Sequence, residues 1–106
     1  MELRHATTRG NLNSILMQGL LPSKSVGKRQ AVWLHSPSKT PWALLHTQTR
    51  KGASLEDVVV LTIQVPRSWL TRHQTGLWFC GRTIPASRIV QVTEATAFAT
   101  SPVLDN

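Results

Sequence analysis

The chain has 106 residues, of which 41% are hydrophobic, which is enough for one modest core and too many for a disordered protein. Twelve Lys and Arg outnumber five Asp and Glu, so we expect a polyanionic partner such as nucleic acid or a phosphorylated small molecule, unless the +7 charge only keeps the protein in solution. The single cysteine, Cys80, excludes an internal disulfide, and no apolar run approaches the roughly 20 residues that span a bilayer. Without a charged-then-apolar leader, we expect a cytoplasmic protein with no membrane partner.

The first part of the chain predicts a strand followed by a short helix. Residues 2–6 read as a strand, and the helix after it carries apolar residues at i, i+3 and i+4. Thr8 or Asn11 can cap this helix, because their side-chain oxygens accept the free amides of a first turn. Gly19 suits the left-handed position at the helix end, and Pro22 prevents the helix from continuing.

The middle of the chain predicts a loop, a strand and a second helix. Residues 23–30 are polar and basic and contain a glycine, which is typical of a loop. Residues 31–35 predict a strand. The second helix begins near Pro41 with Thr40 as its cap, and its pattern fades over residues 47–51.

The second half of the chain is richer in strands. Residues 58–65 predict the strongest strand, and its β-branched run indicates burial on both faces. Residues 67–72 predict one helical turn, and residues 77–80 and 87–92 predict two short strands. Helices thus gather in the first half and strands in the second, which favours an α+β fold over a doubly wound sheet.

The pattern indicates one domain over residues 1–94. Residues 95–106 have little pattern, and we expect them to form a loose C-terminal tail.

The carboxylates do not form a pair that could act as acid and base or hold two metals. They are Glu2, Glu56, Asp57, Glu94 and Asp105. The chain therefore argues against a glycosidase or a two-metal nuclease.

The histidines give a more open signal. They are His5, His35, His46 and His73, without the close spacing of a helical metal-binding pair, and we expect no metal. His5 and His35 lie at predicted strand ends. They could face one cleft, or each could be an ordinary polar residue at a sheet edge.

Basic residues gather in the predicted loop ahead of an aromatic side chain. Lys24, Lys28 and Arg29 precede Trp33. A cationic loop beside a histidine and a flat ring suits a phosphate-bearing ligand whose base stacks on the ring. The same composition would also result if these basic residues were only solvated charges of a loop and bound no ligand.

The segment His5-Ala6-Thr7, followed by the helix from Asn11 to Pro22, resembles the ADP-ribosyltransferase-like superfamily. In that superfamily a strand ending in His-x-Thr is followed by a helix of the form Asn-Leu-x-x-Ile-Leu-x-x-Gly-Leu-x-Pro. The chain is most similar to the catalytic lobe of RNA 2′-phosphotransferases. That lobe continues with four further segments: an Arg before a Val-His-Leu-Ser strand, a valine-rich strand, a Gly-x-x-Phe element and a Val-Pro-x-x-x-Ile ending. The segments of this chain that resemble them are, in the same order, Arg29 to Ser36, Val58 to Val65, Gly76 to Phe79 and Ile84 to Ile89.

This resemblance implies a small α+β fold with two N-terminal helices packed on a split, mostly antiparallel sheet. It also implies NAD or another ADP-ribose nucleotide as ligand. His5 would hydrogen-bond a ribose hydroxyl, Thr7 would brace the strand end, Trp33 would stack on the nicotinamide side and Arg29 would hold a phosphate. His5 and Arg29 are then the catalytic candidates, and His35 joins the residues that bind the ligand.

The chain also departs from the superfamily. Its transferases place a Glu near the position of Trp78, where this chain is apolar, and the phosphotransferases, which lack that Glu too, carry an N-terminal lobe that we do not expect here. Three functions therefore stay open. The first is an NAD-dependent phosphotransferase or ADP-ribosyltransferase acting on RNA or DNA, and the second is a non-catalytic nucleotide- or RNA-binding module. The third is a metal-independent ribonuclease of the toxin kind that uses His5, His35 or His73.

Overall fold

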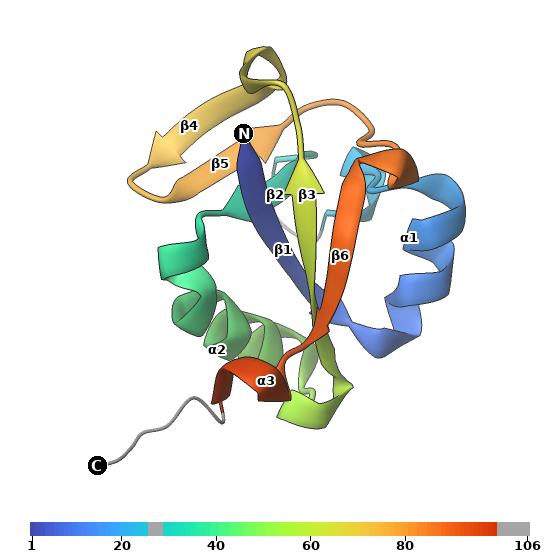
Figure 1. The fold of residues 1–106 in the computed structure, drawn as a ribbon, viewed down its shortest axis with the longest axis vertical. Helices are drawn as coiled ribbons and strands as arrows, with labels where there is room; N and C mark the ends of the chain where they lie inside the picture. The colour runs from blue at the N-terminus through green and yellow to red at the C-terminus, as the bar shows by residue number, and fades with distance from the viewer. Residues whose placement is uncertain (26–28, 100–106) are drawn as a thin grey trace.

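A six-stranded antiparallel sheet forms the centre of the fold (Figure 1). The structure, a computed structural model, describes residues 1–25 and 29–99. The strand order across the sheet is β4-β5-β2-β1-β3-β6. The elements are β1 (Glu2–Thr8), α1 (Leu12–Gln18), β2 (Val32–His35), α2 (Thr40–Lys51), β3 (Val58–Gln64), β4 (Leu70–Gln74), β5 (Leu77–Cys80), β6 (Ile89–Glu94) and α3 (Thr96–Ala99). The α+β class and the antiparallel sheet agree with the prediction.

Each face of the sheet carries a hydrophobic core, because side chains alternate along β3. The first core contains Leu3, Ile15, Leu20, Val32, Leu34, Leu61, Ile63, Val65, Cys80 and Ile84. The second core contains Leu44, Val58, Val60 and Ala95. Helix α1 therefore covers one face through Ile15, whereas α2 covers the other through Leu44. Burial of β3 on both faces confirms the prediction from its β-branched run.

The sheet opens between β1 and β2. Strand β1 pairs with β3 along its whole length, from Glu2 to Thr8. It pairs with β2 at one position only, Arg4 opposite His35. Beyond that position the two strands diverge, and the space between them is where the candidate site lies.

The helix ends differ from the predicted caps. Asn11 stands at the cap position of α1 and Thr40 is the first residue of α2, but neither side chain caps its helix. The Thr40 hydroxyl instead donates to the Pro37 carbonyl at 2.8 Å and accepts from Arg4 Nη1 at 2.9 Å, which ties α2 to β1. Gly19 does end α1, but with φ 83° and ψ −173° rather than in the left-handed helical region.

Strand β4 was not predicted. The helical turn expected over residues 67–72 is limited to Arg67–Trp69, and Leu70–Gln74 then forms the edge strand of a hairpin with β5. Its sequence, Leu-Thr-Arg-His-Gln, is mostly exposed and polar, so it lacks the alternation by which a half-buried strand is recognised.

The beginning of the expected loose tail is ordered. Ala95 is fully buried in the second core, and Phe98 of α3 packs against the same core. An isolated alanine carries no periodic signal, so the sequence gives no sign of this burial. Residues 100–106 lie outside the described residues. None of the described helices is long and apolar enough to cross a bilayer.

Candidate functional site

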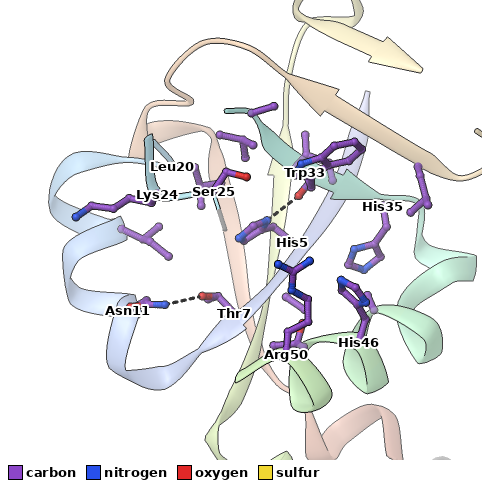
Figure 2. Close-up of a pocket in the computed structure, with 18 of the residues that line it drawn as sticks. His5, Thr7, Asn11, Leu20, Lys24, Ser25, Trp33, His35, His46 and Arg50 are labelled. Carbon is purple, nitrogen blue, oxygen red and sulfur yellow. Dashed lines mark hydrogen bonds between the residues drawn. The ribbon is translucent and has the colours of Figure 1, made fainter. Parts of the chain in front are cut away.

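A cavity of about 720 Å³ lies where β1 and β2 diverge, between α1 and α2 (Figure 2). Side chains alternate along a strand, so His5 and Thr7 project from the face covered by α1, whereas Trp33 and His35 project from the face covered by α2. The opening in the sheet brings these four residues into one cavity. Its volume is within the range of about 300–1,000 Å³ typical of small-molecule sites.

The cavity lining is strongly cationic. Among the described residues, no Asp or Glu lines it. All four histidines of the chain do, together with four Lys and Arg: His5, His35, His46, His73, Lys24, Arg29, Arg50 and Lys51. A concave surface with charge of one sign concentrates ligands of the opposite sign, so the cavity suits an anion.

His5 is held in one orientation by β2. Its Nδ1 lies 2.7 Å from the Trp33 carbonyl oxygen, and because a carbonyl only accepts, Nδ1 must carry the proton. Burial lowers the pKa of His5, the hydrogen bond to Trp33 opposes this shift, and the charge of Lys51 adds to it. A neutral ring with its proton on Nδ1 has an unprotonated Nε2, which Figure 2 shows turned away from Trp33. Nε2 is thus a hydrogen-bond acceptor inside a cationic cavity.

His35 has an unused polar atom in the same cavity. The residue is 3% exposed, and its Nε2 is buried with no hydrogen-bond partner among the described residues. Burial lowers the pKa of His35 to about 4, and the positive charges of His5 and Arg4 contribute to the shift. A buried polar atom without a partner costs free energy, so His35 fits a ligand that supplies one.

His35 also predicts how stability depends on pH. The unfolded residue takes up a proton near its ordinary pKa of 6.5, whereas the folded residue does so only near 4. The unfolded state therefore binds more protons between these values, and the free energy of unfolding falls as the pH drops from 6.5 to 4, by up to roughly 3 kcal/mol. Urea unfolding at steps across this range measures the effect.

The matched protein for this prediction is His35→Gln, which cannot titrate. The lowered pKa values of Glu94, which pairs with Arg9, and of His5 also make stability fall as the pH drops, but both groups are present in both proteins. The difference between the two curves therefore measures His35 together with its charge interaction with His5. Parallel loss of stability in wild type and variant would show that His35 is not the titrating group.

An aromatic cluster on the outer half of the sheet fixes the position of Trp33. Its ring meets His73 edge-on at 5.1 Å and Phe79 at 5.3 Å between centroids. The guanidinium of Arg29 lies over the same Phe79 ring, 4.5 Å from its centroid. Trp33 and Arg29 are therefore held side by side by Phe79, as a stacking residue and a phosphate-binding residue of one site would be.

Three further residues of the lining come from α2 and were not predicted as site residues. Trp42, His46 and Arg50 are spaced by four residues, so they share one helix face. The rings of Trp42 and His46 stack with centroids 4.8 Å apart and 12° between planes, and Trp42 is 47% exposed. Arg50 points toward His5, whereas His46 lies beside His35 (Figure 2). The spacing was readable from the sequence, but only the place of α2 beside the opening shows that this face lines the cavity.

The five predicted site residues all line the cavity: His5, Thr7, Arg29, Trp33 and His35. Thr7 is buried and accepts a hydrogen bond from Asn11 Nδ2 at 3.3 Å, which links β1 to the start of α1. Lys24 also lines the cavity, whereas Lys28 lies outside the described residues.

The described residues contain no group of three His, Cys, Asp or Glu that could hold a metal ion. No protein-family model matches the chain, and no curated protein matches its sequence. The chemistry of the cavity must therefore be argued from its own residues and from the resemblance of its first strand and helix.

Proposed function

We propose that the cavity binds NAD or a related ADP-ribose nucleotide and that the protein removes a 2′-phosphate from RNA with its help. The observation that supports this most directly is the neutral His5, whose Nε2 accepts inside a cavity lined by four Lys and Arg. Such a site combines an acceptor for a hydroxyl with donors for phosphates. A nucleotide with ribose hydroxyls and a diphosphate offers both groups.

The charge and hydrogen-bonding capacity of each side chain determine which part of the nucleotide it can bind. Nε2 of His5 repels a phosphate oxygen, because both are acceptors, but it accepts from a ribose hydroxyl. Arg50 and Lys51 at the end of α2, with Arg29 across the cavity, can donate charge-assisted hydrogen bonds to phosphates. Trp42 stacked on His46 offers an exposed flat surface for a base. These residues fit the ligand that the resemblance implies.

The absence of a carboxylate from the described lining favours a phosphate as the reacting group. Bound NAD would supply an electrophilic ribose carbon with nicotinamide as leaving group. A hydroxyl or amine that attacks such a carbon must lose a proton, and a carboxylate would assist it. A 2′-phosphate is already anionic and can attack that carbon without a base, while the cations of the cavity can bind and orient it. The neighbouring hydroxyl of the same ribose would then attack the phosphorus and release the RNA 2′-oxygen, which takes up the hydroxyl proton. The phosphate would therefore leave the RNA on ADP-ribose.

The histidines argue against the ribonuclease alternative. Cleavage of RNA by two histidines needs one of them protonated as the acid. The pKa of His35 is about 4 and that of His5 is lowered, so both are neutral near pH 7 and neither can serve as that acid. Of the three histidines considered, only the exposed His73 is left for that role.

The test combines binding and turnover. Calorimetric titration with ADP-ribose should show one site. Incubation with NAD and an RNA carrying an internal 2′-phosphate should release nicotinamide and transfer the 2′-phosphate from the RNA to ADP-ribose. The matched control is the same RNA without the 2′-phosphate, which should release no nicotinamide. Binding without either product would leave only the nucleotide-binding module, and no binding of NAD or ADP-ribose would overturn the proposal.

A further inference from the structure

Four arginines lie over two tryptophans at the end of the molecule farthest from α3. Arg82 and Arg88 lie 3.9 and 5.0 Å from the Trp69 ring centroid. Arg67 and Arg72 lie 5.3 and 6.0 Å from that of Trp78. We call Arg67, Trp69, Arg72, Trp78, Arg82 and Arg88 the arginine–tryptophan patch, and we propose that it binds the phosphate backbone of a nucleic acid.

The patch is separate from the cavity. Trp78 pairs with Arg72 across the β4–β5 hairpin, and both Trp78 and Trp69 pack against the first core. Trp33 and Phe79, which belong to the cavity side, occupy the alternate positions of β2 and β5 and therefore the opposite face. In Figure 1 the hairpin and the turn before β4 lie at the opposite end of the molecule from α3.

The stacked guanidinium groups can still donate hydrogen bonds. An arginine that stacks on a ring keeps its N–H groups in the guanidinium plane, where they can bind a phosphate in bidentate fashion. The hydrogen bonds of these arginine side chains to described residues are Arg72 to Thr75 at 3.2 Å and a 3.9 Å contact of Arg67 with the Met1 sulfur. Stacking therefore orients the arginines without using up their donors.

The patch also lacks compensating charge. Among the described residues, the salt bridge joins Arg9 to Glu94, and neither residue belongs to the patch. No described carboxylate therefore forms a salt bridge with an arginine of the patch. Arg82 and Arg88 share the Trp69 ring, and Arg67 and Arg72 share the Trp78 ring, so the two cations of each pair lie close together. Cations this close repel one another, and a partner with regularly spaced phosphates removes that repulsion.

Apolar exposure distinguishes a nucleic acid from a lipid surface. Proteins that lie on membranes insert exposed apolar side chains between lipids. Trp69 and Trp78 are only partly exposed beneath their arginines. The apolar side chains with the highest exposed fractions, Met17 and Leu45, belong to α1 and α2. Charge complementarity to a phosphate backbone thus accounts for the patch better than membrane insertion.

The test measures binding of a fluorescent single-stranded RNA without a 2′-phosphate, and of the matching DNA, at several salt concentrations. Arg82→Gln/Arg88→Gln should weaken binding at least about tenfold and reduce the slope of log affinity against log salt by about 1.4, because two contacts with the phosphates of a single strand are lost. Arg67→Gln/Arg72→Gln should act in the same direction. The control Arg9→Gln/Lys39→Gln removes the same charge outside the patch and should leave the slope unchanged.

The outcomes separate this proposal from the function proposed for the cavity. The RNA carries no group for the cavity to react with, so a cavity that binds no ADP-ribose leaves the patch result intact. In Trp33→Phe/Trp42→Phe, Trp69 and Trp78 are the remaining emitters, and RNA should change their fluorescence. Equal affinity and slope for both patch variants and wild type would overturn the proposal, as would anionic phosphatidylserine vesicles that bind more tightly than RNA and displace it.

Discussion

We expect His5→Ala to lower the affinity for ADP-ribose at least about tenfold and turnover at least about a hundredfold. The substitution removes the Nε2 acceptor that His5 offers to a ribose hydroxyl at the opening of the sheet, together with the Nδ1 hydrogen bond to Trp33. A group that orients the reacting ribose is expected to affect turnover more than binding. Calorimetric titration and the rate of nicotinamide release with 2′-phosphorylated RNA measure the two effects.

Two variants separate the ligand-binding role of His5 from its structural role. The amide of Asn in His5→Asn can still donate to the Trp33 carbonyl but has no group in place of Nε2, so this variant should keep the wild-type unfolding midpoint and lose binding. The control Gln91→Ala replaces an exposed side chain of β6 that does not line the cavity and should change affinity less than about threefold. If His5→Asn binds ADP-ribose as wild type does, His5 serves the fold alone.

The parts of the fold that could be predicted are those with local signals. The β-branched run of β3 and the Gly and Pro that end α1 mark their elements without reference to the rest of the chain. Strand β4 had no such signal, because an exposed edge strand is stabilised by its hydrogen bonds to β5 rather than by apolar alternation. The burial of Ala95 depends on the second core, which is assembled from distant segments.

The candidate site shows the same division. His5, Thr7 and Trp33 could be named from the sequence because they belong to short segments with a recognisable pattern. The hydrogen bond from His5 to Trp33 and the unpartnered Nε2 of His35 could not, since both depend on where β1 and β2 diverge. Long-range pairing sets that point, and a single sequence does not reveal it.

We expect Gly19→Ala to destabilise the fold by roughly 3–5 kcal/mol. At φ 83° and ψ −173°, Gly19 has a backbone conformation that is almost restricted to glycine. A Cβ there would also collide with the Ile84 carbonyl oxygen, which accepts a hydrogen bond from the Leu20 amide at 2.8 Å. Relief of the collision must break this bridge, and a break of this kind belongs among the large single-residue effects. Urea unfolding followed by circular dichroism measures the change.

Gly52→Ala is the matched control, because Gly52 also ends a helix with a positive φ. It lies in the left-handed helical region at φ 61°, and a Cβ there meets no atom within 4 Å, so the substitution should cost only about 1–2 kcal/mol. The difference between the variants measures the collision with Ile84 together with the greater backbone strain at Gly19. Gly19 and Leu20 also line the cavity, so Gly19→Ala should weaken ADP-ribose binding while Gly52→Ala does not. Equal unfolding midpoints would mean that the backbone after α1 can move to accommodate the added Cβ. The hydrogen bonds between Leu20 and Ile84 would then not determine the position of this part of the cavity lining.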